Sequence, residues 1–220
     1  MKAIDIETIP NMDMVDYLPE PEVAIGNLKD PVKISEKTQE AKKKQIEKMG
    51  LDPFFGRICS YAQFGETGDN HFKTIGDATD AEEIELIGHI FKCLSSNLYD
   101  SVESIITWNG FSFDLPYIFK RAAILRVEKP VSCQGLKFWN KKYSSSVHID
   151  LMRELSNWEP HGINLNTAGK LLLGKGKTER DYSTYYDLIK SGKGNLIGLD
   201  NLCDVELTYR IYEMVKGYIF

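Results

Sequence analysis

Trp108-Asn-Gly-Phe-Ser-Phe-Asp-Leu-Pro-Tyr117 marks the point at which the hydrophobic period of the chain changes from strand to helix. Before it, the β-branched residues of Ser104-Ile-Ile-Thr107 form a run short enough for a buried strand. After it, residues 115–127 carry apolar side chains at helical spacing, and Pro116 suits an early helical turn. We therefore expect Asp114 to lie where a strand ends and a helix begins.

Two interpretations of Asp114 are open at this level. A carboxylate at the start of a helix can cap free backbone N–H groups, which is a structural role. Asn109 and Gly110, at the carboxyl end of a strand, favour the edge of a ligand site instead, because α/β sheets bind ligands at that edge. This stretch alone does not separate the two.

The start of the chain, Lys2-Ala-Ile-Asp-Ile-Glu-Thr8, alternates apolar and polar side chains as a strand does. Ile4 and Ile6 are then on one face, and Asp5 and Glu7 share the other. Two like charges about 7 Å apart on one face repel each other unless a cation lies between them. Converging carboxylates are also how proteins hold hard divalent cations such as Mg²⁺. The alternative is a solvent-facing strand whose acids are merely hydrated.

A third segment, residues 200–215, carries apolar side chains at helical spacing from Leu202 to Val215. If Asp200 is the N-cap, Asp204 lies one turn into the helix, near its positive end. Acidic residues are common in first turns, so this helix alone predicts no function.

Three segments of the chain together resemble the exonuclease motifs of the DEDD 3′–5′ exonucleases. The segments are Asp5-Ile-Glu7-Thr8, Asn109-Gly-Phe-Ser-Phe-Asp114 and Cys203-Asp204-Val-Glu-Leu-Thr208. The chain is most similar to stand-alone proteins related to the proofreading exonuclease domain of family B DNA polymerases. Ile25-Gly-Asn-Leu-Lys-Asp-Pro31 and Leu51-Asp-Pro53 are similar to phage-type and bacterial members of that group. The resemblance covers nearly the whole chain, in motif order and spacing as well as in residue identity.

The resemblance implies an α/β fold of the ribonuclease H-like type, with a mixed five-stranded sheet and helices on both faces. Asp5 and Glu7 would lie on its first, central strand. Residues 1–220 would form a single exonuclease domain with a helical insertion at about residues 11–52.

The resemblance also implies a metal-dependent 3′–5′ exonuclease that releases nucleotides from single-stranded DNA by a two-metal mechanism. The acids that would be catalytic and would bind two divalent cations, Mg²⁺ or Mn²⁺, are Asp5, Glu7, Asp114 and Asp204. The residues that would contact the substrate are Thr8, Asn109 and Phe113. The implied partner is the 3′ end of single-stranded DNA, with RNA as an alternative, and the identity of any replication protein that binds the chain stays open.

One position departs from the family pattern. Related enzymes place a tyrosine four residues before the last acid, or a histidine five before it, to orient the attacking water; here those positions hold Asp200 and Leu199. Asp200 is the candidate for this role, and helix capping is its alternative. Tyr182, Tyr185 or Tyr186 would have to reach in from the preceding segment. The departure leaves two other functions open, a catalytically weak or inactive nucleic-acid-binding module and an RNA-trimming exonuclease of the same fold.

Composition fits one α/β domain that needs no membrane. The chain has 220 residues, is 42% hydrophobic, and contains no apolar run near the roughly 20 residues of a membrane span. Its first strand carries two acids, unlike a signal peptide, so we expect a cytoplasmic protein. The four cysteines show no C-x-x-C or zinc spacing and predict reduced, mostly buried thiols. The net charge of −5 predicts that any attraction for phosphate is local.

Period and capping signals predict the remaining elements. In chain order we expect a helix over residues 35–49, a hairpin of strands over 57–64 and 71–75, and helices over 81–94, 148–158, 163–173 and 181–190. Ser35 and Asp80 are the expected caps of the first two helices, and Ile84 is expected to face inward. Residues 192–198 are expected to form a loop.

For two lysine-rich stretches, the sequence does not require a specific binding function. Residues 173–178 look like a phosphate-binding loop, but that motif needs a glycine where Leu171 stands. Its two lysines would at most touch a substrate backbone. Lys42-Lys43-Lys44 is interpreted as a solvated helix face, with a nucleic-acid contact as the alternative.

Overall fold

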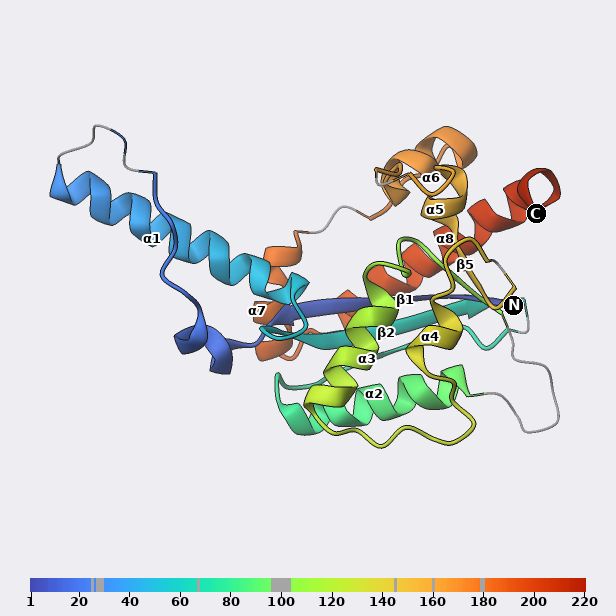
Figure 1. Ribbon diagram of the computed structural model, residues 1–220, viewed down its shortest axis with the longest axis horizontal. Coiled ribbons are helices and arrows are strands. Elements are labelled where there is room, and N and C mark those ends of the chain that lie inside the picture. Colours follow the sequence, from blue (N-terminus) through green and yellow to red (C-terminus); the bar gives the residue numbers. More distant parts are fainter. Residues whose placement is uncertain are drawn as a thin grey trace.

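The computed structural model describes residues 1–24, 26, 30–66, 68–95, 104–144, 146–159, 161–178 and 181–220, so most of the segment 25–29 lies outside it. A five-stranded sheet forms its centre (Figure 1), in the order β3-β2-β1-β4-β5. The strands are β1 (Lys2–Pro10), β2 (Gly56–Gly65), β3 (His71–Thr74), β4 (Ile105–Thr107) and β5 (His148–Asp150). Because β1 pairs antiparallel with β2 and parallel with β4, the sheet is mixed, as expected.

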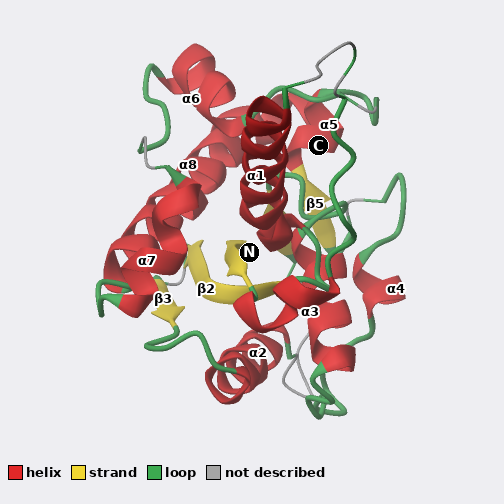
Figure 2. Cartoon of the chain, turned by 90° about the vertical axis from the view of Figure 1, so that its left-hand side faces the viewer, coloured by secondary structure: helices red, strands yellow, loops and turns green. Residues whose placement is uncertain are grey.

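Helices cover both faces of this sheet, which Figure 2 shows between α8 on one side and α2 on the other. The helices of the described residues are η1 (Met12–Tyr17), α1 (Pro31–Lys48), η2 (Met49–Leu51), α2 (Asp80–Leu94), α3 (Asp114–Ile124), α4 (Leu136–Trp139), α5 (Leu151–Leu155), α6 (Leu165–Leu173), η3 (Tyr182–Thr184), α7 (Tyr185–Lys190) and α8 (Asn195–Ile219). Within the described ranges, no helix has both the length and the apolar character needed to cross a bilayer.

Alternation along β1 divides the apolar interior into two cores. Ile4 packs with α2 and α3 on one face of the sheet. Ala3 packs with Val205 of α8 on the other. Asp5 and Glu7 share the face of Ala3, so the strand directs both acids toward α8.

The register of β1 changes between Glu7 and Thr8, because β2 has one extra residue, Cys59, opposite this point. A β-bulge of this kind bends the strand and re-aims the side chains that follow. Ile58 and Cys59, which are adjacent in the bulged strand β2, therefore both lie in the α2 core, where Ile6 and Ile9 of β1 also lie.

Helix α1 starts earlier than predicted, and its cap is Asp30 rather than Ser35. The Asp30 side chain accepts a hydrogen bond of 3.0 Å from the backbone N–H of Val32. Pro31 stands in the first turn, where its missing N–H costs nothing. The Asp-Pro pair is thus the stronger start signal, and Ser35 lies inside the helix.

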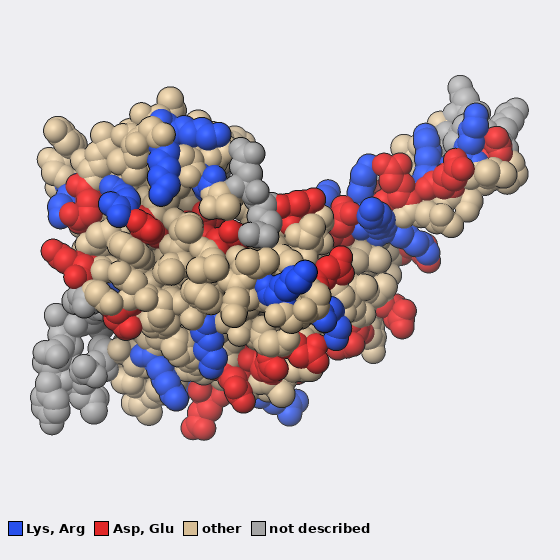
Figure 3. Space-filling model, turned by 180° about the vertical axis from the view of Figure 1, so that it is seen from behind, with Lys and Arg blue, Asp and Glu red and all other residues tan. Residues whose placement is uncertain are grey.

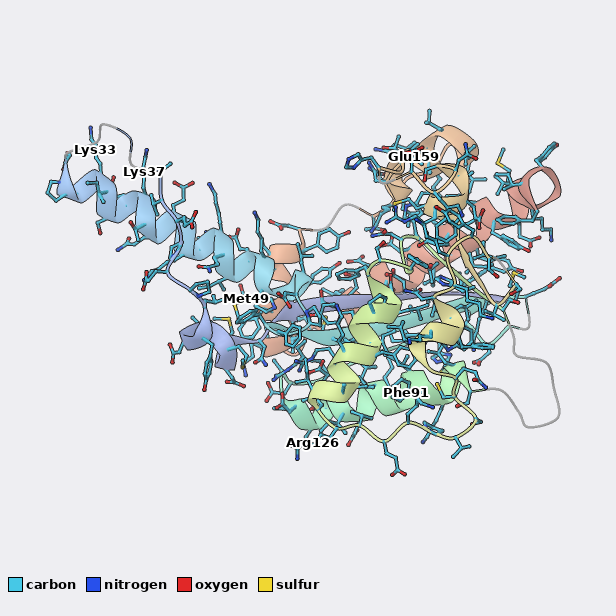
Figure 4. All side chains as sticks on the ribbon, in the orientation of Figure 1. Lys33, Lys37, Met49, Phe91, Arg126 and Glu159 are labelled. Atoms are coloured by element: carbon cyan, nitrogen blue, oxygen red, sulfur yellow. The ribbon has the colours of Figure 1, made fainter. Side chains whose placement is uncertain are left out.

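Helix α1 extends from the body as an arm, with Lys33 and Lys37 in its outer half and buried Met49 at its base (Figure 4). Acidic and basic side chains are interspersed along this arm (Figure 3). The lysines at 42, 43 and 44 each approach a glutamate. Exposed pairs of this kind contribute little to stability, because water screens them.

The prediction of a helix starting at His148 was wrong, because His148–Asp150 forms strand β5 and pairs in parallel with β4. Helix α5 starts only at Leu151, and Asp150 is its N-cap. A strand of three residues is too short for its hydrophobic period to be measured against a helix.

Two details of α2 also differ from expectation. Thr79 is the N-cap, whereas Asp80 is the first helical residue and accepts a hydrogen bond from Arg57. Ile84 is exposed rather than buried. The inward face of α2 consists instead of Glu83, Leu86, Ile87, Ile90, Phe91 and Leu94.

Helix α8 starts at Asn195, so the predicted loop over residues 192–198 is partly helical and Asp200 does not cap the helix. The loop prediction failed because Gly198 resembles a loop residue in the sequence, although it lies inside α8. A Cβ at this position would lie 2.1 Å from the ring of Phe72, so only glycine permits the helix to approach β3 this closely.

His148 is buried where β5 meets β4. Its Nδ1 lies 3.2 Å from the carbonyl oxygen of Trp139, which can only accept, so Nδ1 carries the proton. Its Nε2 is then free to accept from the Thr107 hydroxyl at 2.8 Å. Burial lowers the pKa of His148 from 6.5 to about 4.

We expect this histidine to make stability depend on pH. Below pH 6.5 the unfolded chain binds a proton that the folded chain excludes until about pH 4, so the free energy of unfolding falls as pH falls through this window. The full loss is about 3 kcal/mol. Urea unfolding at several pH values should give a flatter profile for His148→Gln. His161→Gln, which removes an exposed histidine, is the matched control, and an equally flat profile in the control would contradict the assignment.

Candidate metal centre

Three acids from opposite ends of the chain meet on the sheet face that α8 covers. Asp5 and Glu7 come from β1 and Asp204 from the middle of α8, and one carboxylate oxygen of each lies within 4.8 Å of the others. Glu7 and Asp204 are buried, and Asp5 is half-buried. Strand alternation supplies two of the acids and the packing of α8 supplies the third.

Asp114 lies beside these three acids at the start of α3. Its Oδ1 accepts a hydrogen bond of 3.1 Å from the backbone N–H of Ile6, and its side chain is buried. It does not cap α3, since Phe113 holds the N-cap position without a side-chain hydrogen bond. The bond to Ile6 joins α3 to β1 and fixes the Asp114 carboxylate near that of Asp5.

Burial raises the pKa values of all four carboxyl groups, and the charges of neighbouring carboxylates add to the rise. Burial acts most strongly on Asp5, followed by the charge of Asp114, and holds the pKa of Asp5 well above its usual range. Burial also raises the pKa of Glu7 to about 8 and that of Asp114 to about 6. It raises the pKa of Asp204 too, against the opposing charge of Lys177. A cluster that resists ionisation on its own favours a bound cation, which stabilises the charged forms.

Lys177 supplies a positive charge that the sequence analysis did not assign to this site. Its Nζ lies 2.5 Å from Oδ2 of Asp204 and donates to the Tyr182 hydroxyl at 2.8 Å. Burial disfavours the charged ammonium, but Asp204 and then Asp5 outweigh this and raise the pKa of Lys177. The sequence signal that could have placed Lys177 at this site is the pair of glycine-flanked lysines in residues 173–178. The sequence analysis assigned to these lysines at most a contact with the substrate backbone.

Asp200 lies one helical turn before Asp204, and its side chain is buried. Its charge raises the pKa of both Glu7 and Asp204, so its carboxylate is near theirs. Tyr185 is buried close by; burial and then the charge of Glu7 raise its pKa. Both side chains therefore lie at the Glu7 side of the cluster.

An open hollow of about 410 Å³ adjoins the acids, and its lining includes Trp108, Asn109, Asn164, Asn166, Lys177 and Tyr182. Asn109 has a left-handed backbone, with φ +69°. Its N–H donates to the Asp150 carboxylate at 3.0 Å, which holds the turn after β4 in place. Of the three residues expected to contact the substrate, Asn109 is therefore the one that lines this hollow.

The other two residues expected to contact a substrate do not line that hollow. Phe113 is half-buried and packs against Tyr117, with ring centroids 5.3 Å apart. Thr8 is half-buried at the bulge of β1. Trp108, which does line the hollow, also packs against the α8 core.

Comparison with known proteins identifies relatives of this chain. Residues 52–218 match a family model described as "Predicted 3'-5' exonuclease related to the exonuclease domain of PolB". The match includes Asp114 and Asp204, whereas Asp5 and Glu7 precede it. The family predicted from the three sequence motifs is confirmed.

Two DNA polymerases are similar to part of the chain. DNA polymerase 1 of Saccharolobus solfataricus is 33% identical over 111 residues, which are 45% of this chain and 12% of that protein. DNA polymerase 1 of Aeropyrum pernix is 33% identical over 84 residues, 34% of this chain and 9% of that protein. The aligned segments thus span about a tenth of the length of these relatives.

A solved structure is similar over nearly the whole chain. The family B DNA polymerase from the hyperthermophilic archaeon Pyrobaculum calidifontis matches with a TM-score of 0.58 at 16% identity, covering 98% of this chain and 24% of that one. At this identity the likeness shows the fold alone, which is α/β and ribonuclease H-like, as expected.

We expect Lys177→Met to destabilise the metal-free protein, because the substitution leaves the buried Asp204 carboxylate without its partner. Breaking a fully buried ion pair costs about 3–5 kcal/mol, and partial exposure of Lys177 reduces this to about 1–3 kcal/mol. Chemical unfolding in chelator measures the change. Lys175→Met, which removes an exposed lysine of the same loop, is the matched control; equal stability of the two variants would show that the ion pair contributes nothing.

Proposed function

This chain belongs to the family of predicted 3′–5′ exonucleases related to the exonuclease domain of PolB, and from that premise we propose that it removes nucleotides from the 3′ end of single-stranded DNA. The observation that carries the proposal is the convergence of Asp5, Glu7 and Asp204 within 4.8 Å, next to Asp114. Buried acids from separate segments that raise one another's pKa have no evident structural use, whereas hydrolysis of an anionic ester requires cations that such acids hold.

The donor set fits hard divalent cations. Carboxylate oxygens are the ligands that Mg²⁺ and Mn²⁺ prefer, and the described cluster contains no competing histidine. In our proposal Asp5, Glu7, Asp114 and Asp204 would hold two such ions. When bound, the ions would activate a water molecule and stabilise the leaving oxygen.

Side chains of α8 and the preceding segment would orient the reacting groups. Asp200 faces the same cluster as Asp204 and would accept a hydrogen bond from the attacking water, the task that a tyrosine performs in related enzymes. Lys177, which pairs with Asp204, would also offer its positive charge to the scissile phosphate. Tyr182, which accepts a hydrogen bond from Lys177, would hold the ammonium in position.

The hollow beside the acids would hold the terminal nucleotide. Trp108 and Tyr182 offer ring faces to unpaired bases, and stacking of this kind tolerates any base. Asn109 would contact the sugar or base, while Thr8 and Phe113 would form the wall nearer β1. We further propose that residues 1–220 form a single domain, with a helical insertion at about residues 11–52. The proposed location is the cytoplasm.

We expect 5′-labelled single-stranded DNA to give a ladder of shortened products with Mg²⁺ or Mn²⁺ and none in chelator. Asp5→Asn removes one of the carboxylates that would hold the cations. It should lower the rate by at least about 10³-fold, since metal ions contribute several kcal/mol to such reactions. Asp16→Asn, which changes an exposed acid of η1, is the control.

Three outcomes of this assay would change the proposal. Full-length DNA that persists at stoichiometric protein contradicts it. A gel shift without shortening indicates a nucleic-acid-binding module. Faster shortening of a matched RNA identifies an RNA-trimming enzyme, because the two substrates differ at the 2′-hydroxyl.

The role of Asp200 has a separate test. Asp200→Asn should lower the single-turnover rate by about 10²–10⁴-fold, the range for loss of a general base, and leave the affinity for DNA unchanged. Fluorescence anisotropy with labelled DNA in Ca²⁺ measures the affinity. Tyr182→Phe, which keeps the ring but loses the hydroxyl, is the companion variant; a full rate in Asp200→Asn and a large loss in Tyr182→Phe would assign the water-orienting role to Tyr182.

A further inference from the structure

A second group of metal-ligating side chains lies on the other face of the sheet. His71 comes from β3, His89 and Cys93 come from α2, and one donor atom of each lies within 4.8 Å of the others. His89 and Cys93 are four residues apart on the helix, so they face the same way. His71 pairs with Gln63, whose side chain contacts Tyr61 in the α2 core. The sheet therefore separates this group from the carboxylates.

The distances within the group match those of a tetrahedral metal site. His71 Nε2 lies 3.0 Å from His89 Nε2, and Cys93 Sγ lies 3.5 Å from the same nitrogen. With Zn–N bonds of about 2.0–2.1 Å and a Zn–S bond of about 2.3 Å, tetrahedral angles give about 3.3–3.4 Å between nitrogens and about 3.5–3.6 Å between nitrogen and sulfur. These two distances therefore need shifts of at most a few tenths of an ångström, and the donor atoms of His71 and Cys93 lie within 4.8 Å of each other.

A carboxylate outside the three donors fixes the orientation of one ring. Asp69 Oδ1 lies 3.1 Å from His71 Nδ1, so this nitrogen carries the proton and Nε2 presents its lone pair to His89. Asp69 is itself held by the amide of Gln63 at 2.9 Å. Carboxylate, imidazole and metal in this sequence are the usual arrangement around protein-bound zinc.

One proton cannot serve every contact within the group. His89 Nε2 faces both the lone pair of His71 and the sulfur of Cys93. If this nitrogen is protonated it can donate to only one of them, and Cys93 also has a hydrogen bond with the Tyr61 side chain. A cation at the centre would bind all three donor atoms at once.

The surroundings pack against the donors and favour a neutral His89. The Tyr61 ring makes edge contacts with the rings of His71 and His89, at centroid distances of 6.4 and 5.9 Å. Burial and then the charge of His71 lower the pKa of His89, which favours the neutral imidazole that binds metal. Lys2 donates to the Cys93 carbonyl at 2.7 Å, and its charge lowers the thiol pKa that burial raises.

We propose that His71, His89 and Cys93 bind one structural Zn²⁺ ion, with water as the fourth ligand. Binding would release the Cys93 thiol proton to solvent. The ion would join α2 to β3, the short edge strand of the sheet, and so hold that edge in place. This site is independent of the carboxylate centre and of the proposed nuclease activity.

Titration of metal-free protein with Co²⁺ tests the proposal, because thiolate-to-cobalt charge-transfer absorption arises only where a cysteine binds the metal. We expect the band to saturate at one cobalt per chain and to disappear when Zn²⁺ is added. Cys93→Ser should abolish the band and His89→Gln should weaken Co²⁺ binding at least about 10-fold, the range for loss of a ligand or its support. Cys203→Ser, which removes the exposed cysteine beside Asp204, is the matched control and should keep the band.

Thermal unfolding provides a second readout. In an Asp5→Asn background, which disables the carboxylate centre, Zn²⁺ should raise the melting temperature, and the rise should vanish when Cys93→Ser is added. Circular dichroism establishes that each variant is folded, and His71→Gln replaces Cys93→Ser if the latter is not. Absence of the cobalt band in the wild type, or its persistence in folded Cys93→Ser, overturns the proposal and leaves a hydrogen-bonded cluster.

Discussion

Repulsion between buried carboxylates is the constraint on which the remaining structure depends. Asp5, Glu7 and Asp204 are held where their ionised forms are disfavoured, by burial and by the charges of neighbouring carboxylates. The apolar contact of Ala3 with the α8 core holds the strand and the helix together in spite of this repulsion. Lys177 offsets part of the negative charge, and in our proposal bound cations offset the rest.

Much of the site could be predicted because its signals are local. Asp5 and Glu7 share a face by strand alternation alone, and Asp114 follows a strand-to-helix boundary that the hydrophobic period makes visible. Their convergence with Asp204 depends on tertiary packing, which the sequence indicated only through resemblance to a family. The nuclease family is now shown, whereas the roles of these acids stay proposals.

The features that sequence analysis missed depend on contacts between distant segments. Gly198 resembles a loop residue, and its place inside α8 is set by the nearby ring of Phe72. Lys177 forms its ion pair with Asp204, which lies 27 residues farther along the chain in α8, so no local pattern connects them. His89 and Cys93 are spaced for one helix face, but their third partner comes from a hairpin, and zinc-motif spacing rules do not include that arrangement.

The extra residue in β2 has a consequence for protein engineering. Asp5 and Glu7 face α8 by alternation, and Cys59 shifts the pairing of β1 with β2 just after Glu7, before Ile9 enters the opposite core. The packing behind the motif therefore depends partly on a neighbouring strand that contributes no acid to it. A designer who transplants Asp5 and Glu7 into another sheet would have to carry over the irregular partner strand as well, or lose the packing behind the acids.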